Sequence, residues 1–302
     1  MASLKDIRGR ISSVKNIRKI TRAMEMVAAA RLRRAELRIE HLRPYADAIR
    51  RMTARASQAA ENIPSLPILE EKESVQTVGL LLVTGDRGLA GPFNSQIIRA
   101  GNRRAAELRS DGKQVLWYVS GRRGLSSLEF RKLEVGGSWT GFTDRPAFAD
   151  ARAIADGLTS AYVDDKVDRV EIIYNGYISA INQEVRRETL LPLQQADVIA
   201  EDEGEDGGSE QEERESRALW IYEPDPEEIL ARLVPDYVEI SIYRALLEST
   251  ASEHGARMSA MRSASDNAAD IIDDLTLEAN RQRQAEITQE IMEVVAGAEG
   301  LR

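Results

Sequence analysis

The chain contains no cysteine, and this absence removes several classes of function at once. Without thiols there is no disulfide framework, no thiolate metal site and no cysteine nucleophile. His41 and His254 are the only histidines, and no histidine-metal spacing or histidine-based triad can be built from them. We therefore expect no metal site, no cofactor and no catalytic residue of the chain's own.

Aromatic residues and long apolar runs are also scarce. Aromatics make up 5% of the chain and charged residues 30%, a balance that favours long helices. No apolar run approaches the ~20 residues that span a bilayer, and residues 1–10 lack the apolar core of a signal peptide. The sequence predicts a soluble, intracellular protein that does not cross a membrane.

The net charge of −9 hides two oppositely charged ends. Residues 1–55 carry an excess of about ten positive charges, and residues 223–302 an excess of about ten negative charges. A basic arm can bind nucleic acid, but an acidic arm in the same chain explains both ends by mutual neutralisation. We favour the pairing of the two ends; salt-dependent retention of DNA or RNA would indicate the alternative.

The N-terminal segment, residues 1–62, predicts a very long helix. Ser3 and Asp6 form a candidate capping box, Pro44 is expected to kink the helix, and Pro64 and Pro67 to end it. Apolar side chains recur every three or four residues, as on one face of a helix; they are Leu4, Ile7, Ile11, Val14, Ile17, Ile20, Met24 and Val27.

The C-terminal segment, residues 225–302, predicts a second long helix. Asp225 is its expected cap, Pro226 its first residue, and Pro235 should kink or break its first turns. Its stripe has coiled-coil spacing with many small or polar members; it consists of Leu247, Thr250, His254, Met258, Met261, Ser265, Ala268, Ile272, Leu275, Ala279 and Gln282. The simplest assembly is an antiparallel coiled coil of the two ends.

The central residues 74–222 predict a different kind of fold. Apolar runs at 78–84, 115–119 and 169–174 are typical of buried strands. Helical segments are expected at 95–109 and 147–162, and further strands at 183–193 and 218–222. This alternation predicts a Rossmann-like α/β domain with a mostly parallel sheet covered by helices.

Residues 84–91 follow the first expected strand and hold three glycines. Such a loop can bind phosphate at a helix N-terminus, but it matches neither the dinucleotide nor the P-loop pattern. We favour a structural turn. The alternative is an α/β nucleotide-binding enzyme with coiled-coil dimerisation arms.

Several ordered motifs together resemble the gamma subunit family of the rotary ATP synthase. They are residues 4–8, 19–29, 86–89 with Asn94, 222–226, 287–290, Glu293, Gly297 and Ala298. The resemblance covers nearly the whole chain, and Gly300 departs from the usual final small or basic residue. It implies a non-catalytic rotor in the central stalk that couples proton-driven rotation of the c-ring to conformational cycling of the catalytic beta subunits and ATP synthesis.

The resemblance also implies partners and a location. The partners are the alpha and beta subunits of the catalytic head, the epsilon subunit and the membrane c-ring, with no nucleic acid. The chain would be a peripheral protein on the cytoplasmic face of the bacterial plasma membrane.

Contact residues follow from the resemblance position by position. They are Arg283 and Gln284 as the catch pair for a beta-subunit loop, Glu253 and Arg257 as further beta contacts, Met24 and Thr288 in coupling, Trp220, Tyr222 and Glu223 at the c-ring, and Ile291, Val294 and Val295 at the shaft tip. The simpler interpretations are exposed helix residues for the catch pair, an intrahelical pair for Glu253 and Arg257, packing for the coupling and tip residues, and a strand end with a helix cap for the c-ring group.

Residues 201–216 contain nine acidic side chains and no apolar one. Such a segment buries too little surface to order itself, so we interpret it as a mobile acidic loop.

We predict that deleting residues 202–215 leaves folding intact, because the loop contributes no apolar core. The measurement is the melting temperature by circular dichroism. A large drop in melting temperature would show that the loop is structural.

Overall fold

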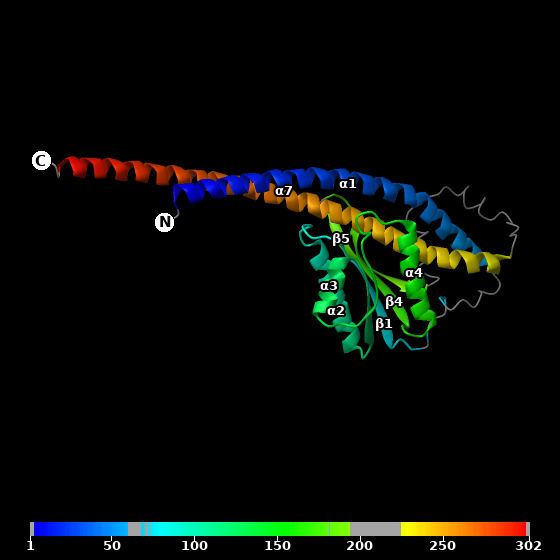
Figure 1. Ribbon diagram of the computed structural model, residues 1–302. Coiled ribbons are helices and arrows are strands. Elements are labelled where there is room, and N and C mark those ends of the chain that lie inside the picture. The colour runs from blue at the N-terminus through cyan, green and yellow to red at the C-terminus, as the bar shows by residue number, and fades with distance from the viewer. Residues whose placement is uncertain are drawn as a thin grey trace. The chain divides into compact units, whose positions relative to one another are not determined.

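The computed structural model describes residues 3–59, 68–69, 72, 74–180, 182–193 and 225–299. The elements in chain order are α1 (Leu4–Ala59), β1 (Thr77–Val83), α2 (Phe93–Ser110), β2 (Gln114–Ser120), α3 (Arg122–Phe130), β3 (Val135–Trp139), α4 (Phe148–Val163), β4 (Arg169–Tyr177), β5 (Gln183–Leu191) and α7 (Pro226–Glu299) (Figure 1). They form two compact units, Arg31–Ala256 and Met1–Ala30 with Arg257–Arg302. Both long helices contribute to each unit. The three-part division at residues 62, 74, 222 and 225 stays a prediction.

Within the described residues, the strands form one five-stranded sheet in the order β3-β2-β1-β4-β5. β1 pairs in parallel with both β2 and β4, and Leu81 lies between Tyr118 and Ile172. β3 adds to β2 in parallel, and β5 adds to β4 in the antiparallel direction. This confirms the α/β fold and the mostly parallel sheet.

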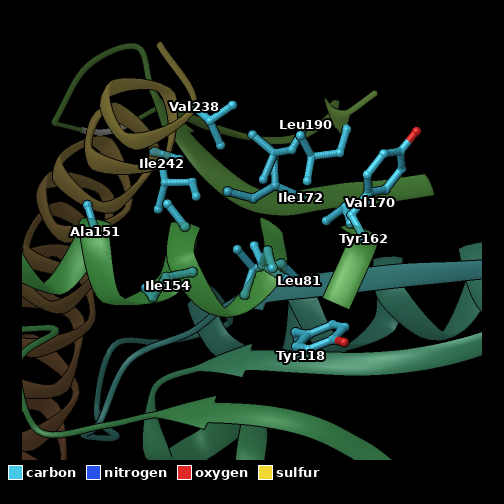
Figure 2. Packing of buried hydrophobic residues seen from close by; sticks show 14 of the residues in the cluster. Leu81, Tyr118, Ala151, Ile154, Tyr162, Val170, Ile172, Leu190, Val238 and Ile242 are labelled. Carbon is cyan, nitrogen blue, oxygen red and sulfur yellow. The ribbon is translucent and has the colours of Figure 1, made fainter. Parts of the chain in front are cut away.

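Side chains of β1 alternate between two apolar clusters, because successive residues of a strand point to opposite faces. Leu81 joins a cluster with Ile154 of α4 and Val238 of α7 (Figure 2). Leu80 and Leu82 join the other cluster, with side chains of α2 and α3. Burial on both faces explains why this strand reads as a continuous apolar run.

α3 and β3 are elements that the sequence patterns did not predict. β3 contains Gly136 and Gly137 in five residues, and two adjacent glycines weaken the strand signal of the Val135 and Trp139 that flank them. α3 carries Gly124, where a Cβ would lie 2.6 Å from Cγ2 of Val119. Glycine lets α3 lie close against the sheet, and it also weakens the helical signal in the sequence.

α1 is a helix of 56 residues that continues through Pro44. Ser3 and Asp6 form the predicted capping box: the amide and hydroxyl of Ser3 donate to Asp6 Oδ2 at 3.2 and 2.8 Å, and the amide of Asp6 donates to Ser3 Oγ at 3.3 Å.

The buried stripe of α1 follows the predicted one only over its first part. Ile17, Ile20 and Val27 are 52%, 59% and 53% exposed, whereas Thr21 and Ala28 are buried. The prediction was wrong here because it followed the apolar residues. The seam instead continues with small side chains that permit close approach of another helix.

α7 is a helix of 74 residues that continues through Pro235. Its predicted stripe is confirmed in the unit that it forms with the start of α1, where Met261, Ser265, Ala268 and Ile272 are buried. The two helices run in opposite directions there (Figure 1), and Arg262 Nε of α7 pairs with Glu25 Oε1 of α1 at 3.0 Å. The antiparallel pairing of the chain's ends is thereby confirmed.

A buried ion pair joins α2 to the sheet. Arg104 of α2 donates from Nε and Nη2 to the two carboxylate oxygens of Glu171 on β4, at 2.8 and 2.7 Å. The Glu171 side chain is 4% exposed. This hydrogen-bonded carboxylate raises the pKa of Arg104 above its ordinary value.

We predict that Arg104→Gln lowers the free energy of unfolding by about 3–5 kcal/mol, because it leaves the Glu171 carboxylate buried without its cation. Urea denaturation measures the change. Arg152→Gln is the matched control, since Arg152 also pairs with a glutamate, Glu239, but is 56% exposed. It should cost at most about 1 kcal/mol, and equal losses for the two variants would contradict the prediction.

Candidate functional site

The edge of the sheet at the carboxyl ends of the strands is where the fold would place a ligand. In open α/β sheets ligands bind outside these ends, at the point where the strand order reverses. Here that point lies between β1 and β4, because β2 and β3 lie on one side of β1 and β4 on the other. The glycine-containing loop 84–91 follows β1 at this edge.

α7 occupies this edge. Its residues 245–255 are all buried. Glu253 packs on the loop after β1: a Cβ on Gly85 would lie 2.8 Å from the Glu253 carboxylate. Ser252 Oγ donates to the carbonyl oxygen of Asn175 on β4 at 3.1 Å, and a Cβ on Gly255 would lie 2.8 Å from the Ala180 carbonyl oxygen. A helix of the chain itself thus lies where a nucleotide would bind. This argues against the alternative of a nucleotide-binding enzyme.

The loop after β1 is fixed by its own polar side chains. Asp86 accepts hydrogen bonds from the amides of Gly141, Arg122 and Thr143 at 2.9, 3.0 and 3.2 Å. Burial tends to raise the pKa of Asp86, but these bonds and one from the Thr143 hydroxyl outweigh it, so the pKa lies below its ordinary value. Asn94 Oδ1 accepts from the Gly85 amide at 2.8 Å. The motif at residues 86–94 is therefore structural, as favoured from the sequence.

A cavity of about 620 Å³ lies between α1, β5 and α7 in the Arg31–Ala256 unit. Arg186 Nη1 pairs with Glu248 Oε2 at 3.3 Å, and the Tyr177 hydroxyl donates to Glu36. Burial raises the pKa of Glu248, although Arg244 and Arg186 oppose the shift. The lining mixes four arginines with four acids, so it lacks the field of one sign that selects an anionic cofactor.

The contact residues inferred from the resemblance lie in different environments. Arg283, Gln284 and Thr288 are exposed on α7, and the Thr288 hydroxyl donates to the Gln284 carbonyl oxygen at 2.8 Å. Met24 of α1 is half-buried. These roles stay predictions.

The remaining contact residues divide into three groups. Glu253 and Arg257 are 3% and 9% exposed, so little of either side chain is available to a partner. The tip residues are exposed; they are Ile291, Val294 and Val295. The c-ring group lies outside the described residues; it consists of Trp220, Tyr222 and Glu223.

The described residues also bear on metal ions and membranes. In the described ranges, no group of three or more histidine, aspartate or glutamate side chains is arranged to hold a metal ion. Over the same ranges, no helix has both the length and the apolar character required to cross a bilayer.

Known proteins resemble the chain over its full length. The family model described as ATP synthase matches residues 3–301. The ATP synthase gamma chain of Rubrobacter xylanophilus is 42% identical over 303 residues, which cover 100% of this chain and 99% of that protein. The ATP synthase gamma chain of Nostoc punctiforme is 41% identical, with 100% of both chains covered.

Solved structures agree with this assignment. A chain from the central stalk and c-ring of the Tetrahymena thermophila mitochondrial ATP synthase superposes with a TM-score of 0.59 at 28% identity, covering 82% of this chain and 99% of that one. A chain of the Euglena gracilis mitochondrial ATP synthase, at 17% identity, shares the fold with a TM-score of 0.68, covering 99% and 94%. The chain belongs to the ATP synthase gamma-chain family, and its role is that of the non-catalytic rotor subunit in the central stalk.

Proposed function

We propose that this chain transmits rotation of a proton-driven membrane c-ring to the catalytic beta subunits and thereby couples proton flow to ATP synthesis. The observation that supports this most directly is the position of α7 at the ligand edge of the sheet. In this chain, the edge of the sheet at which folds of this type bind nucleotides is occupied by the helix α7. Nucleotide chemistry is then left to partner subunits.

The long helices suit mechanical transmission. At 1.5 Å per residue, the 74 residues of α7 extend over about 110 Å. Its seam residues Ser265 and Ala268 are small, and the positions between them are polar. The seam residues face α1, and the exposed polar positions 266 and 267 form an outer surface that can turn within a ring of subunits without a strong preference for one angle.

The proposed contacts follow the family resemblance. Arg283 and Gln284 would hydrogen-bond a beta-subunit loop, since an exposed arginine can bind a carboxylate through two bonds. Met24 and Thr288 would act in coupling. The exposed apolar residues 291, 294 and 295 would turn in an apolar bearing, because their burial by partner subunits is favourable.

The foot and the location complete the proposal. Trp220, Tyr222 and Glu223 would contact the c-ring, with the epsilon subunit beside them. Glu253 and Arg257 would meet the beta subunit only through the small part of each side chain that is exposed. The assembled complex would place the chain at the cytoplasmic face of a bacterial plasma membrane, as a peripheral subunit.

We predict that the isolated chain has no ATPase activity but greatly raises the activity of an alpha–beta preparation when added to it. The reason is that it brings no catalytic group and acts by driving the beta subunits through their states. A coupled ATPase assay before and after addition measures this. If the alpha–beta preparation gained nothing, the proposed function would be wrong.

We predict that Arg283→Ala lowers the ATPase turnover of the assembled complex about fivefold, the effect of losing a contact worth about 1 kcal/mol, while assembly stays intact. Arg281→Ala is the matched control. Arg281 is exposed on the same helix but projects about 200° away, and its loss should leave turnover unchanged. Unchanged turnover in Arg283→Ala would argue against the catch role.

A further inference from the structure

The loop between β3 and α4 places one carboxylate among three other segments of the Arg31–Ala256 unit. Asp144 Oδ2 pairs with the guanidinium of Arg31 on α1 and lies 3.8 Å from Arg87 Nη1 in the loop after β1. Its other oxygen, Oδ1, lies 3.7 Å from Nε2 of His254 on α7. Asp144 therefore brings together both long helices and the edge of the sheet.

This loop is itself held firmly on the sheet. Besides accepting the Thr143 amide, the Asp86 carboxylate accepts the Thr143 hydroxyl at 3.0 Å, and the Asp86 amide donates back to that hydroxyl at 2.9 Å. The Thr143 carbonyl oxygen accepts the hydroxyl of Thr250 on α7 at 2.9 Å. A continuous polar path thus leads from β1 through the loop to α1 and α7.

The residues of this path lie where the two helices pass out of the α/β unit. Arg31 is the first residue of the unit Arg31–Ala256, and His254 lies two residues before its end. Arg31 and Asp144 are each about one-third exposed, so their attraction is screened less than that of a pair in open water.

We propose that Asp144 is a positioning residue that fastens α1 to the α/β fold, beside the attachment of α7 to the same loop through Thr143, so that the fold and the helices turn as one body. The inference rests on the proposed rotor function and assigns the mechanical joint within it. A second attachment of α1, from Glu36 to Tyr177, lies further along the same helix. Both contacts act beside the apolar packing of α1, in which Ile49 clusters with Leu233 and Ile240 of α7.

The experiment measures torsional stiffness in the assembled complex. Because the chain has no cysteine, Asp111→Cys in the exposed turn after α2 provides a single attachment point on this chain for a bead, with cysteines of the other subunits replaced beforehand. With the catalytic head fixed to a surface and stalled without ATP, the angular variance of the bead reports the compliance between head and α/β fold. Asp144→Asn and Arg31→Gln should each raise this variance above that of the unaltered chain, since each removes the same attachment of α1 to the α/β fold.

Controls separate the joint from general loosening. Arg87→Gln is matched to Arg31→Gln, since it removes an arginine from the same carboxylate without touching a long helix, and it should leave the variance unchanged. Combining Asp144→Asn with Arg31→Gln should add nothing to either single change, and Asp144→Glu should restore most of the stiffness. The melting temperatures of all variants are measured alongside and should stay close to that of the unaltered chain.

The outcomes are distinct. Unaltered stiffness in both Asp144→Asn and Arg31→Gln, or equal softening by Arg87→Gln, would overturn the inference. If Asp144→Asn failed to assemble, Arg31→Gln alone would decide the same question. A complex that neither rotates nor gains ATPase activity with the unaltered chain would instead refute the proposed function.

Discussion

The burial of α7 in the carboxyl edge of the sheet is the contact on which the rest of the arrangement depends. Residues 245–255 are enclosed on all sides, with Glu253 against Gly85 and Ser252 bonded to β4. This single placement closes the site where an α/β fold binds its ligand. It also gives a very long helix a fixed position in a compact unit. The loss of ligand binding and the gain of a mechanical role are therefore two results of the same packing.

Much of the fold could be predicted because its signals are local. β1 and β4 are buried on both faces and read as apolar runs, and the α7 stripe from Met261 to Ile272 is confirmed because its spacing alone defines it. β3 was missed because glycine at 136 and 137 interrupts the short strand signal of Val135 and Trp139. The α1 seam was misplaced because Thr21 and Ala28 are buried by virtue of their size, which a search for apolar residues does not detect.

The site was less predictable because its contacts join distant parts of the sequence. The glycines of loop 84–91 could be identified as a structural turn, but nothing local shows that Glu253 covers Gly85. Asp86 and Thr143 are 57 positions apart, and single aspartates and threonines are too common to attract notice. His254 could be placed on the stripe of α7, while its position near Asp144 depends on the whole fold. The contact residues on α7 came from resemblance, since exposed side chains leave no packing signal.

The close approach at Gly255 turns a local packing detail into a long-range constraint. A Cβ there would lie 2.8 Å from the Ala180 carbonyl oxygen, so the hairpin between β4 and β5 has no room for a side chain at this point. Residues 256–299 of α7 would form a rod about 65 Å long, and a tilt of about 5° at its base moves its far end by about 6 Å. A methyl group at position 255 would therefore force α7 or the hairpin to move. The steric cost is local, but the displacement of α7 grows with distance along the helix.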